Sequence, residues 1–91
     1  MTVLVASKKM KVTQALRIFA QEQAEKLHKL KKNISQVRIY LETIADKKSE
    51  KSANIVTYKV AIPGKDVIVK KSAVDMYTAI ASGAAAALRK L

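Results

Sequence analysis

The sequence contains no cysteine and a single histidine, His28. Without cysteine there is neither a disulfide framework nor a thiolate metal site, and one imidazole cannot form a histidine cluster. The sequence also lacks a nucleophile-base pair, a P-loop and a glycine-rich phosphate-binding motif. It therefore predicts a protein that is not an enzyme and has no cofactor, no metal and no small-molecule substrate, with His28 as a surface residue.

Acidic residues are scarce as well, since 7 Asp and Glu stand against 18 Lys and Arg, for a formal net charge of +11. Such a charge repels itself in a compact chain unless a polyanion is bound. It indicates nucleic acid or an anionic membrane surface as partner. The apolar residues 1–7 are too few for a signal peptide or a membrane span, so we expect a soluble cytoplasmic protein that binds no membrane.

Two segments have the three- and four-residue apolar spacing of amphipathic helices. The first runs from an N-cap at Thr13 to Asn33, and the second from an N-cap at Asp75 to Leu91. The apolar stripe of the first consists of Leu16, Phe19, Ala20, Gln23, Leu27 and Leu30. The stripe of the second consists of Met76, Ile80, Ala84, Ala87, Leu88 and Leu91. We expect Met76 and Tyr77 to anchor the second helix to the core.

Four other segments have the composition or the alternation of β-strands. Their expected positions are residues 2–6, 36–44, 54–62 and 67–70. Pro63-Gly64 suits a tight type II turn, and the lysine-rich residues 45–52 suit a hairpin loop. The order β-α-β-β-β-α predicts an α+β fold, a two-layer sandwich in which two helices pack on one face of a four-stranded sheet. The last three strands would form an antiparallel meander.

Two stretches are the most distinctive: Ser-Lys-Lys-Met-Lys-Val-Thr-Gln-Ala-Leu-Arg at residues 7–17 and Asp-Met-Tyr-Thr-Ala-Ile at residues 75–80. With the order of elements, they resemble the ribosome hibernation-promoting factor and ribosome-associated inhibitor A family, also called YfiA or sigma-54 modulation proteins. The resemblance spans nearly the whole chain and is to the short form. It implies one ribosome-binding domain over residues 1–91, without the C-terminal dimerisation domain of the long members.

The resemblance also implies a function. Such a protein binds the small ribosomal subunit in the mRNA and tRNA channel through rRNA phosphate contacts, where it inhibits translation and stabilises idle, hibernating ribosomes as part of a stress response. We expect the free protein to be a monomer or a weak homodimer.

Basic residues on the two helices meet the rRNA backbone in that family. The matching positions that keep a positive charge here are Lys8, Arg17, Lys26, Lys29 and Arg89. We add four further candidate RNA-binding residues, Lys32, Arg38, Lys70 and Lys90. Family members usually carry more Lys or Arg along the last helix, where this sequence has Ala84 to Ala87. The cations that could compensate from the sheet side are Lys47, Lys48, Lys51, Lys70 and Lys71.

Some alternatives stay open at this point. Arg17 either contacts phosphate or pairs with an acid such as Glu22 or Glu25. Tyr40, on the polar side of its strand, either stacks on an unpaired base or packs against a cross-strand neighbour. For the whole protein, the alternatives are a stand-alone double-stranded RNA-binding module and a structural protein that self-associates through its last helix.

Overall fold

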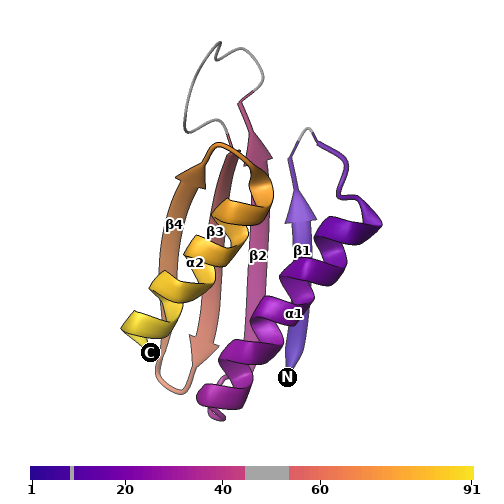
Figure 1. The fold of residues 1–91 in the computed structure, drawn as a ribbon. Coiled ribbons are helices and arrows are strands. Elements are labelled where there is room, and N and C mark those ends of the chain that lie inside the picture. The colour runs from indigo at the N-terminus through magenta and orange to yellow at the C-terminus, as the bar shows by residue number, and fades with distance from the viewer. Residues whose placement is uncertain (9, 45–53) are drawn as a thin grey trace.

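The computed structural model describes residues 1–8, 10–44 and 54–91 (Figure 1). The elements are β1 (Thr2–Ser7), α1 (Gln14–Leu30), β2 (Gln36–Thr43), β3 (Asn54–Ile62), β4 (Lys65–Ala73) and α2 (Met76–Lys90). Figure 1 shows both helices on the same side of a four-stranded sheet. The predicted order and the predicted two-layer α+β sandwich are therefore confirmed.

The strands lie in the spatial order β1-β2-β3-β4. β1 is parallel to β2, because α1 connects the two strands as a crossover. β2, β3 and β4 pair antiparallel and confirm the predicted meander. β4 is longer than the predicted 67–70, because it pairs with β3 along its whole length. Gly64, before β4, has the positive φ of 89° that the predicted turn requires; the loop predicted at 45–52 lies outside the described residues.

The hydrophobic core lies between the sheet and the helices. Alternate residues of the two central strands point into it and are at most 1% exposed: Val37, Ile39, Leu41, Val56, Tyr58 and Val60. The residues between them lie on the second face of the sheet, which the helices do not cover (Figure 1). We call this second face the open face.

The N-cap of α1 forms as predicted, since the Thr13 Oγ1 accepts a hydrogen bond from the Leu16 N at 3.2 Å. The helix ends earlier than predicted, because Lys31 has the extended values φ −132° and ψ 91°. The placement of Leu30 on the core stripe is wrong, because its side chain is 63% exposed. Leu30 belongs to the last turn, and Ile34, in the segment that follows, is buried in the core instead.

Asp75 caps α2 as predicted, because its carboxylate accepts hydrogen bonds from the Thr78 N at 2.9 Å and the Thr78 Oγ1 at 2.8 Å. These bonds hold the pKa of the Asp75 carboxyl below its usual value. Met76 is buried and anchors the helix. The same expectation for Tyr77 is wrong, because one residue further round the helix its side chain is 44% exposed. Its ring meets Phe19 of α1 edge-on, with 5.3 Å between centroids.

Gly83 brings α2 directly against the sheet. A Cβ atom added at Gly83 would lie 2.6 Å from the Cε1 of Tyr58 and 3.0 Å from the Cγ1 of Val56. The Tyr58 hydroxyl donates a hydrogen bond to the Ile80 carbonyl oxygen at 2.8 Å. Burial raises the pKa of the Tyr58 hydroxyl, which therefore stays a neutral donor. The small residues of α2 thus allow the close approach to the sheet for which their size is suited.

Candidate nucleic-acid interface

The nine candidate cations come from several elements, and eight of them are exposed while Arg38 is half-buried. Lys8 follows β1, Arg17, Lys26 and Lys29 belong to α1, Lys32 follows α1, Arg38 belongs to β2, Lys70 to β4, and Arg89 and Lys90 to α2. The fold brings some of them together and separates others. Each group is described in turn below.

Three candidates border one groove between the edge strand β4 and the end of α2. This groove encloses a cavity of about 430 Å³. Its lining residues are Ile68, Val69, Lys70, Lys71, Ala86, Arg89 and Lys90. Four of these seven are cationic and none is acidic, so the cavity attracts anions. We call it the basic groove.

The alternation of β4 places two successive lysines on either side of this edge strand. Val69 is buried against the helix layer, so Lys71, two residues on, also lies on the helix side and is half-buried. Lys70 lies on the open face. The sequence predicts Lys71 only as a compensating charge, although the alternation of buried Val67 and Val69 is the signal that places it beside α2.

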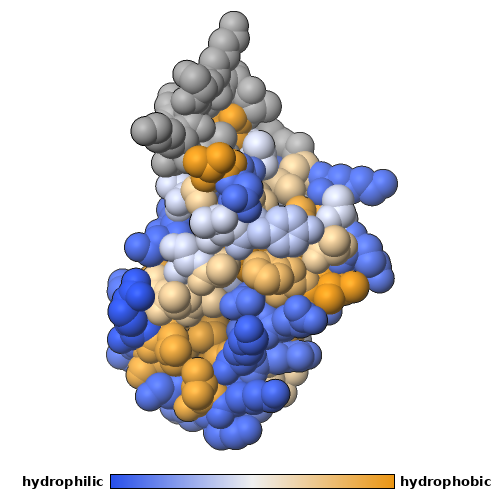
Figure 2. All heavy atoms as spheres, in the orientation of Figure 1, coloured by the Kyte–Doolittle hydropathy of each residue, from blue (hydrophilic) through white to orange (hydrophobic). Residues whose placement is uncertain are grey.

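Both helices end at the same end of the molecule, where the chain also turns from β3 to β4 (Figure 1). The last turn of α1 carries His28 and Lys29, and that of α2 carries Arg89 and Lys90. Cations are favoured there by the negative end of the helix dipole. With the neighbouring lysines they form what we call the basic end: Lys29, Lys31, Lys32, Lys65, Arg89 and Lys90. Figure 2 shows hydrophilic residues gathered along this end and over α1.

Lys26 lies apart from these cations, beside a groove between the two helices. This groove encloses about 190 Å³ and is mostly apolar. Its lining residues are Gln23, Lys26, Leu27, Leu30, Ala81, Ala84, Ala85 and Leu88. The alanine run of α2 borders it, yet of residues 84–87 only Ala85 is exposed, since the other three are buried. The departure from the family pattern therefore changes a single exposed position of this run.

Arg17 and Lys8 lie toward the other end of the molecule, where β1 ends and α1 begins (Figure 1). The Arg17 Nη1 donates a hydrogen bond to the Val5 carbonyl oxygen at 3.2 Å. This contact is neither of the two that the sequence suggests for Arg17, and it ties α1 to β1. The guanidinium keeps further donors for an anion.

The open face holds Arg38 together with two residues that the sequence does not assign as a group. Arg38 stands in register between Leu4 of β1 and Lys59 of β3. Its Nε is buried and has no hydrogen-bond partner. The Lys59 Nζ lies 5.7 Å from the centroid of the Tyr40 ring. Tyr40 has the predicted position on the polar side of β2.

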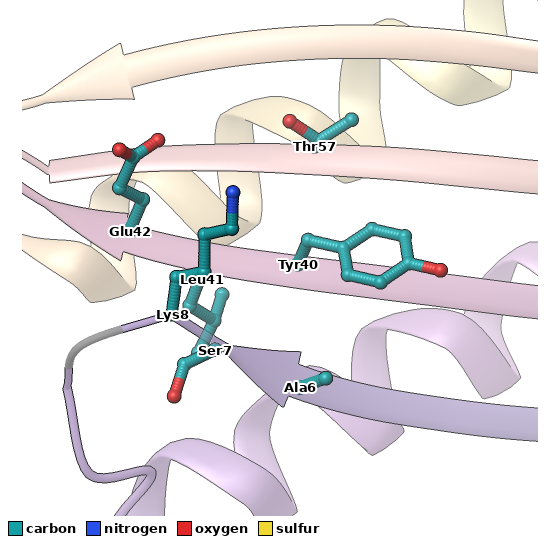
Figure 3. Close-up of a pocket in the computed structure, with 7 residues that line it drawn as sticks. All are labelled: Ala6, Ser7, Lys8, Tyr40, Leu41, Glu42 and Thr57. Atoms are coloured by element: carbon teal, nitrogen blue, oxygen red, sulfur yellow. The ribbon is translucent and has the colours of Figure 1, made fainter.

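The tips of β1 and β2 enclose a second cavity of about 430 Å³ on the open face (Figure 3). Its lining residues are Ala6, Ser7, Lys8, Tyr40, Leu41, Glu42 and Thr57. We call it the tyrosine hollow. It contains one cation and one carboxylate, so it differs in charge from the basic groove.

The described residues offer charge and shape for binding. In residues 1–8, 10–44 and 54–91, no group of three or more His, Cys, Asp and Glu side chains could hold a metal ion. Within the same ranges, neither helix has the length and apolarity needed to cross a bilayer.

Comparison with known proteins identifies the family. Two solved structures share the fold: a ribosomal subunit interface protein from Coxiella burnetii (TM-score 0.84, 19% identity, covering 100% of this chain and 93% of that one) and the N-terminal domain of Protein Y from Thermus thermophilus (TM-score 0.82, 18% identity, 99% and 94%). The curated proteins contain no match. Residues 3–91 match the family described as sigma 54 modulation protein / S30EA ribosomal protein, which is not a family of enzymes. The chain therefore belongs to the sigma 54 modulation and S30EA ribosomal protein family.

Proposed function

We propose that this protein binds the small ribosomal subunit in the channel for mRNA and tRNA, inhibits translation there and stabilises idle ribosomes in the cytoplasm. Residues 1–91 would act as one ribosome-binding domain. The description of the family supports an association with the ribosome. So does the similar Coxiella burnetii protein, which is described as a ribosomal subunit interface protein.

The basic groove is the observation that carries the proposal. Lys70, Lys71, Arg89 and Lys90 line one cavity without an acidic neighbour. Each phosphate that such cations neutralise releases counterions, which gives affinity without base recognition. The guanidinium of Arg89 can in addition bind a phosphate through two parallel hydrogen bonds. The basic end continues this charge across the ends of both helices, so an RNA backbone can follow a path longer than the groove.

Co-sedimentation with purified small subunits, large subunits and a generic RNA duplex tests the proposal, at salt concentrations from roughly 50 to 300 mM. We expect saturable binding, near one protein per small subunit, that persists at the higher salt. Addition of the protein to a cell-free translation reaction should lower initiation.

The basic groove is tested by a double variant, Lys70→Gln with Arg89→Gln. Removing two phosphate contacts should weaken binding and reduce the slope of log affinity against log salt by about 2. Lys11→Gln serves as the control, since Lys11 is exposed and lies outside the groove and the basic end. An unchanged slope in the double variant would contradict the role of the groove.

Two outcomes would overturn the proposed function itself. Equal and salt-sensitive binding to both subunits and to the duplex would favour the double-stranded RNA-binding module. Absence of RNA binding, with a molecular size that grows with protein concentration, would favour the self-associating protein.

A further inference from the structure

The ring of Tyr40 is not covered by its cross-strand neighbours. In the register of the sheet, Tyr40 stands between Ala6 of β1 and Thr57 of β3. Both side chains are too small to cover an aromatic ring. Figure 3 shows the ring lying along β2 with a broad face exposed, and with its hydroxyl directed away from Glu42. Cross-strand packing, one of the two roles open to Tyr40, therefore reduces to the contact with the Lys59 ammonium.

Cations surround this ring on three strands. Lys59 lies over it, and Arg38 is two residues before it on the same face of β2. Lys70 stands at the end of the same cross-strand row, beyond Thr57. The tyrosine hollow adjoins the ring on the other side, with Lys8 and Glu42 at its border (Figure 3). An aromatic face, a hollow and basic side chains thus meet in one place.

We propose that this part of the open face binds an unpaired RNA nucleotide, with the base stacked on Tyr40 and the phosphate held by Arg38 and Lys59. The inference rests on the proposed RNA-binding function and adds base stacking to its phosphate contacts. Stacking on an aromatic side chain is the common way in which proteins hold unpaired bases, because every base has a π face.

The unpartnered Nε of Arg38 supports a phosphate partner. A buried donor without an acceptor loses its hydration and gains nothing in return. The Nε–H and a neighbouring Nη–H of a guanidinium form a fork that matches two oxygens of a phosphate. A bound nucleotide would therefore supply the acceptor that the described residues do not offer to Arg38.

Lys59 does not block the stacking position. An exposed cation over an aromatic ring is held more weakly than a stacked base, so the base can displace it. The released ammonium then lies close to the phosphate of the same nucleotide, which gives it a partner of opposite charge. The contact between Lys59 and Tyr40 therefore keeps the ring covered only until RNA arrives.

Glu42 gives the hollow a preference among bases. An ionised carboxylate only accepts hydrogen bonds, and it repels phosphate. Cytosine carries an amino donor where uracil carries a carbonyl oxygen, while the two rings have the same size. A base edge that faces Glu42 should therefore be cytosine rather than uracil.

Binding of short, unstructured oligocytidine and oligouridine to the whole chain tests the inference at low salt. Tyr40→Ala should weaken oligocytidine binding about tenfold or more, and Tyr40→Trp should retain it. Tyr77→Ala is the matched control, because it removes an exposed tyrosine from α2 and should leave binding unchanged. Glu42→Gln should abolish the preference for cytidine. Thermal unfolding of each variant verifies that it is folded.

The results separate this inference from the proposed function when the same variants are sedimented with small subunits. If folded Tyr40→Ala binds both oligonucleotides like the unchanged protein, the stacking site is refuted, whether or not subunits are bound. If the unchanged protein binds small subunits but no oligonucleotide, the proposed function stands and the stacking site is refuted. If Tyr40 governs oligonucleotide binding but subunits are not bound, the stacking site stands and the proposed function fails.

Discussion

Tyr58 and Tyr40 lie on neighbouring strands of one sheet, but on opposite faces. Tyr58 is fully buried beneath α2, and its hydroxyl donates to the Ile80 carbonyl oxygen. Tyr40 is half-buried on the open face, between the small residues Ala6 and Thr57. The same side chain therefore stabilises the fold on one face and stays available to a ligand on the other.

The two faces differ in charge in the same way. Among the described residues no polar or charged side chain other than a tyrosine is buried in the core. The open face carries Arg38, Lys59 and Lys70 beside Glu42. Because both helices cover a single face (Figure 1), stability and binding can be changed independently.

The largest expected effect separates the two tyrosines directly. Tyr58→Ala should lower the free energy of unfolding by about 4 kcal/mol, because it leaves a cavity beneath α2. Tyr40→Ala should lower it by less than about 1 kcal/mol, because no side chain is packed over its ring. Urea unfolding measures both. Equal losses would mean that the open face stabilises the fold as much as the covered face.

A second variant changes the contact on the covered face from the side of the helix. Gly83→Ala should destabilise the protein by about 2 kcal/mol, because the new methyl group would overlap the Tyr58 ring. This is opposite to helix propensity, which favours alanine over glycine by about 1 kcal/mol. Ala85→Gly, at the exposed position of the same helix, measures propensity alone. A stabilised Gly83→Ala would show that the ring moves away at little cost.

The hydroxyl of Tyr58 should have a smaller effect than its ring. Tyr58→Phe should cost about 1 kcal/mol, since it removes the donor to the Ile80 carbonyl oxygen within the core. Tyr40→Phe is the control on the open face and should leave the unfolding midpoint unchanged. If both hydroxyls had the same effect, the hydrogen bond to Ile80 would not contribute to stability.

The smallest expected effect concerns the cap of α2. The pKa of Asp75 is lowered from 3.8 by its hydrogen bonds to Thr78, so its ionised form is favoured in the folded state. Its contribution to stability is present above pH 3.8 and is lost as the pH falls through the lower folded pKa. Asp75→Asn keeps the cap but removes this pH dependence. Identical stability profiles below pH 5 for both proteins, to within about 1 pH unit of the reference pKa, would contradict the assignment.

Periodicity predicts the elements of this fold well, because each strand and helix has one buried face. The apolar spacing identifies the caps Thr13 and Asp75, and the alternation of β2 and β3 assigns their faces correctly. The errors, Leu30 and Tyr77, lie at the ends of helices. There the distance to the sheet, rather than the helical period, decides whether a side chain is buried.

The candidate site is less predictable than the fold. The sequence names Lys70, Arg89 and Lys90 individually, but their meeting in one groove depends on how α2 crosses the edge strand. No local pattern contains that crossing. The uncovered ring of Tyr40 likewise depends on the register of three strands, which places Ala6 and Thr57 beside it. Resemblance to a family indicates that cations matter, whereas only the tertiary structure shows which of them act together.

The contact between Gly83 and Tyr58 has a consequence for sequence divergence. Neither residue can enlarge alone, because the Cβ position at Gly83 already overlaps the ring. A larger residue on the helix should be accepted only after a smaller one has replaced the tyrosine on the strand. We therefore expect these two positions to change together across distant relatives, although they are far apart in the chain.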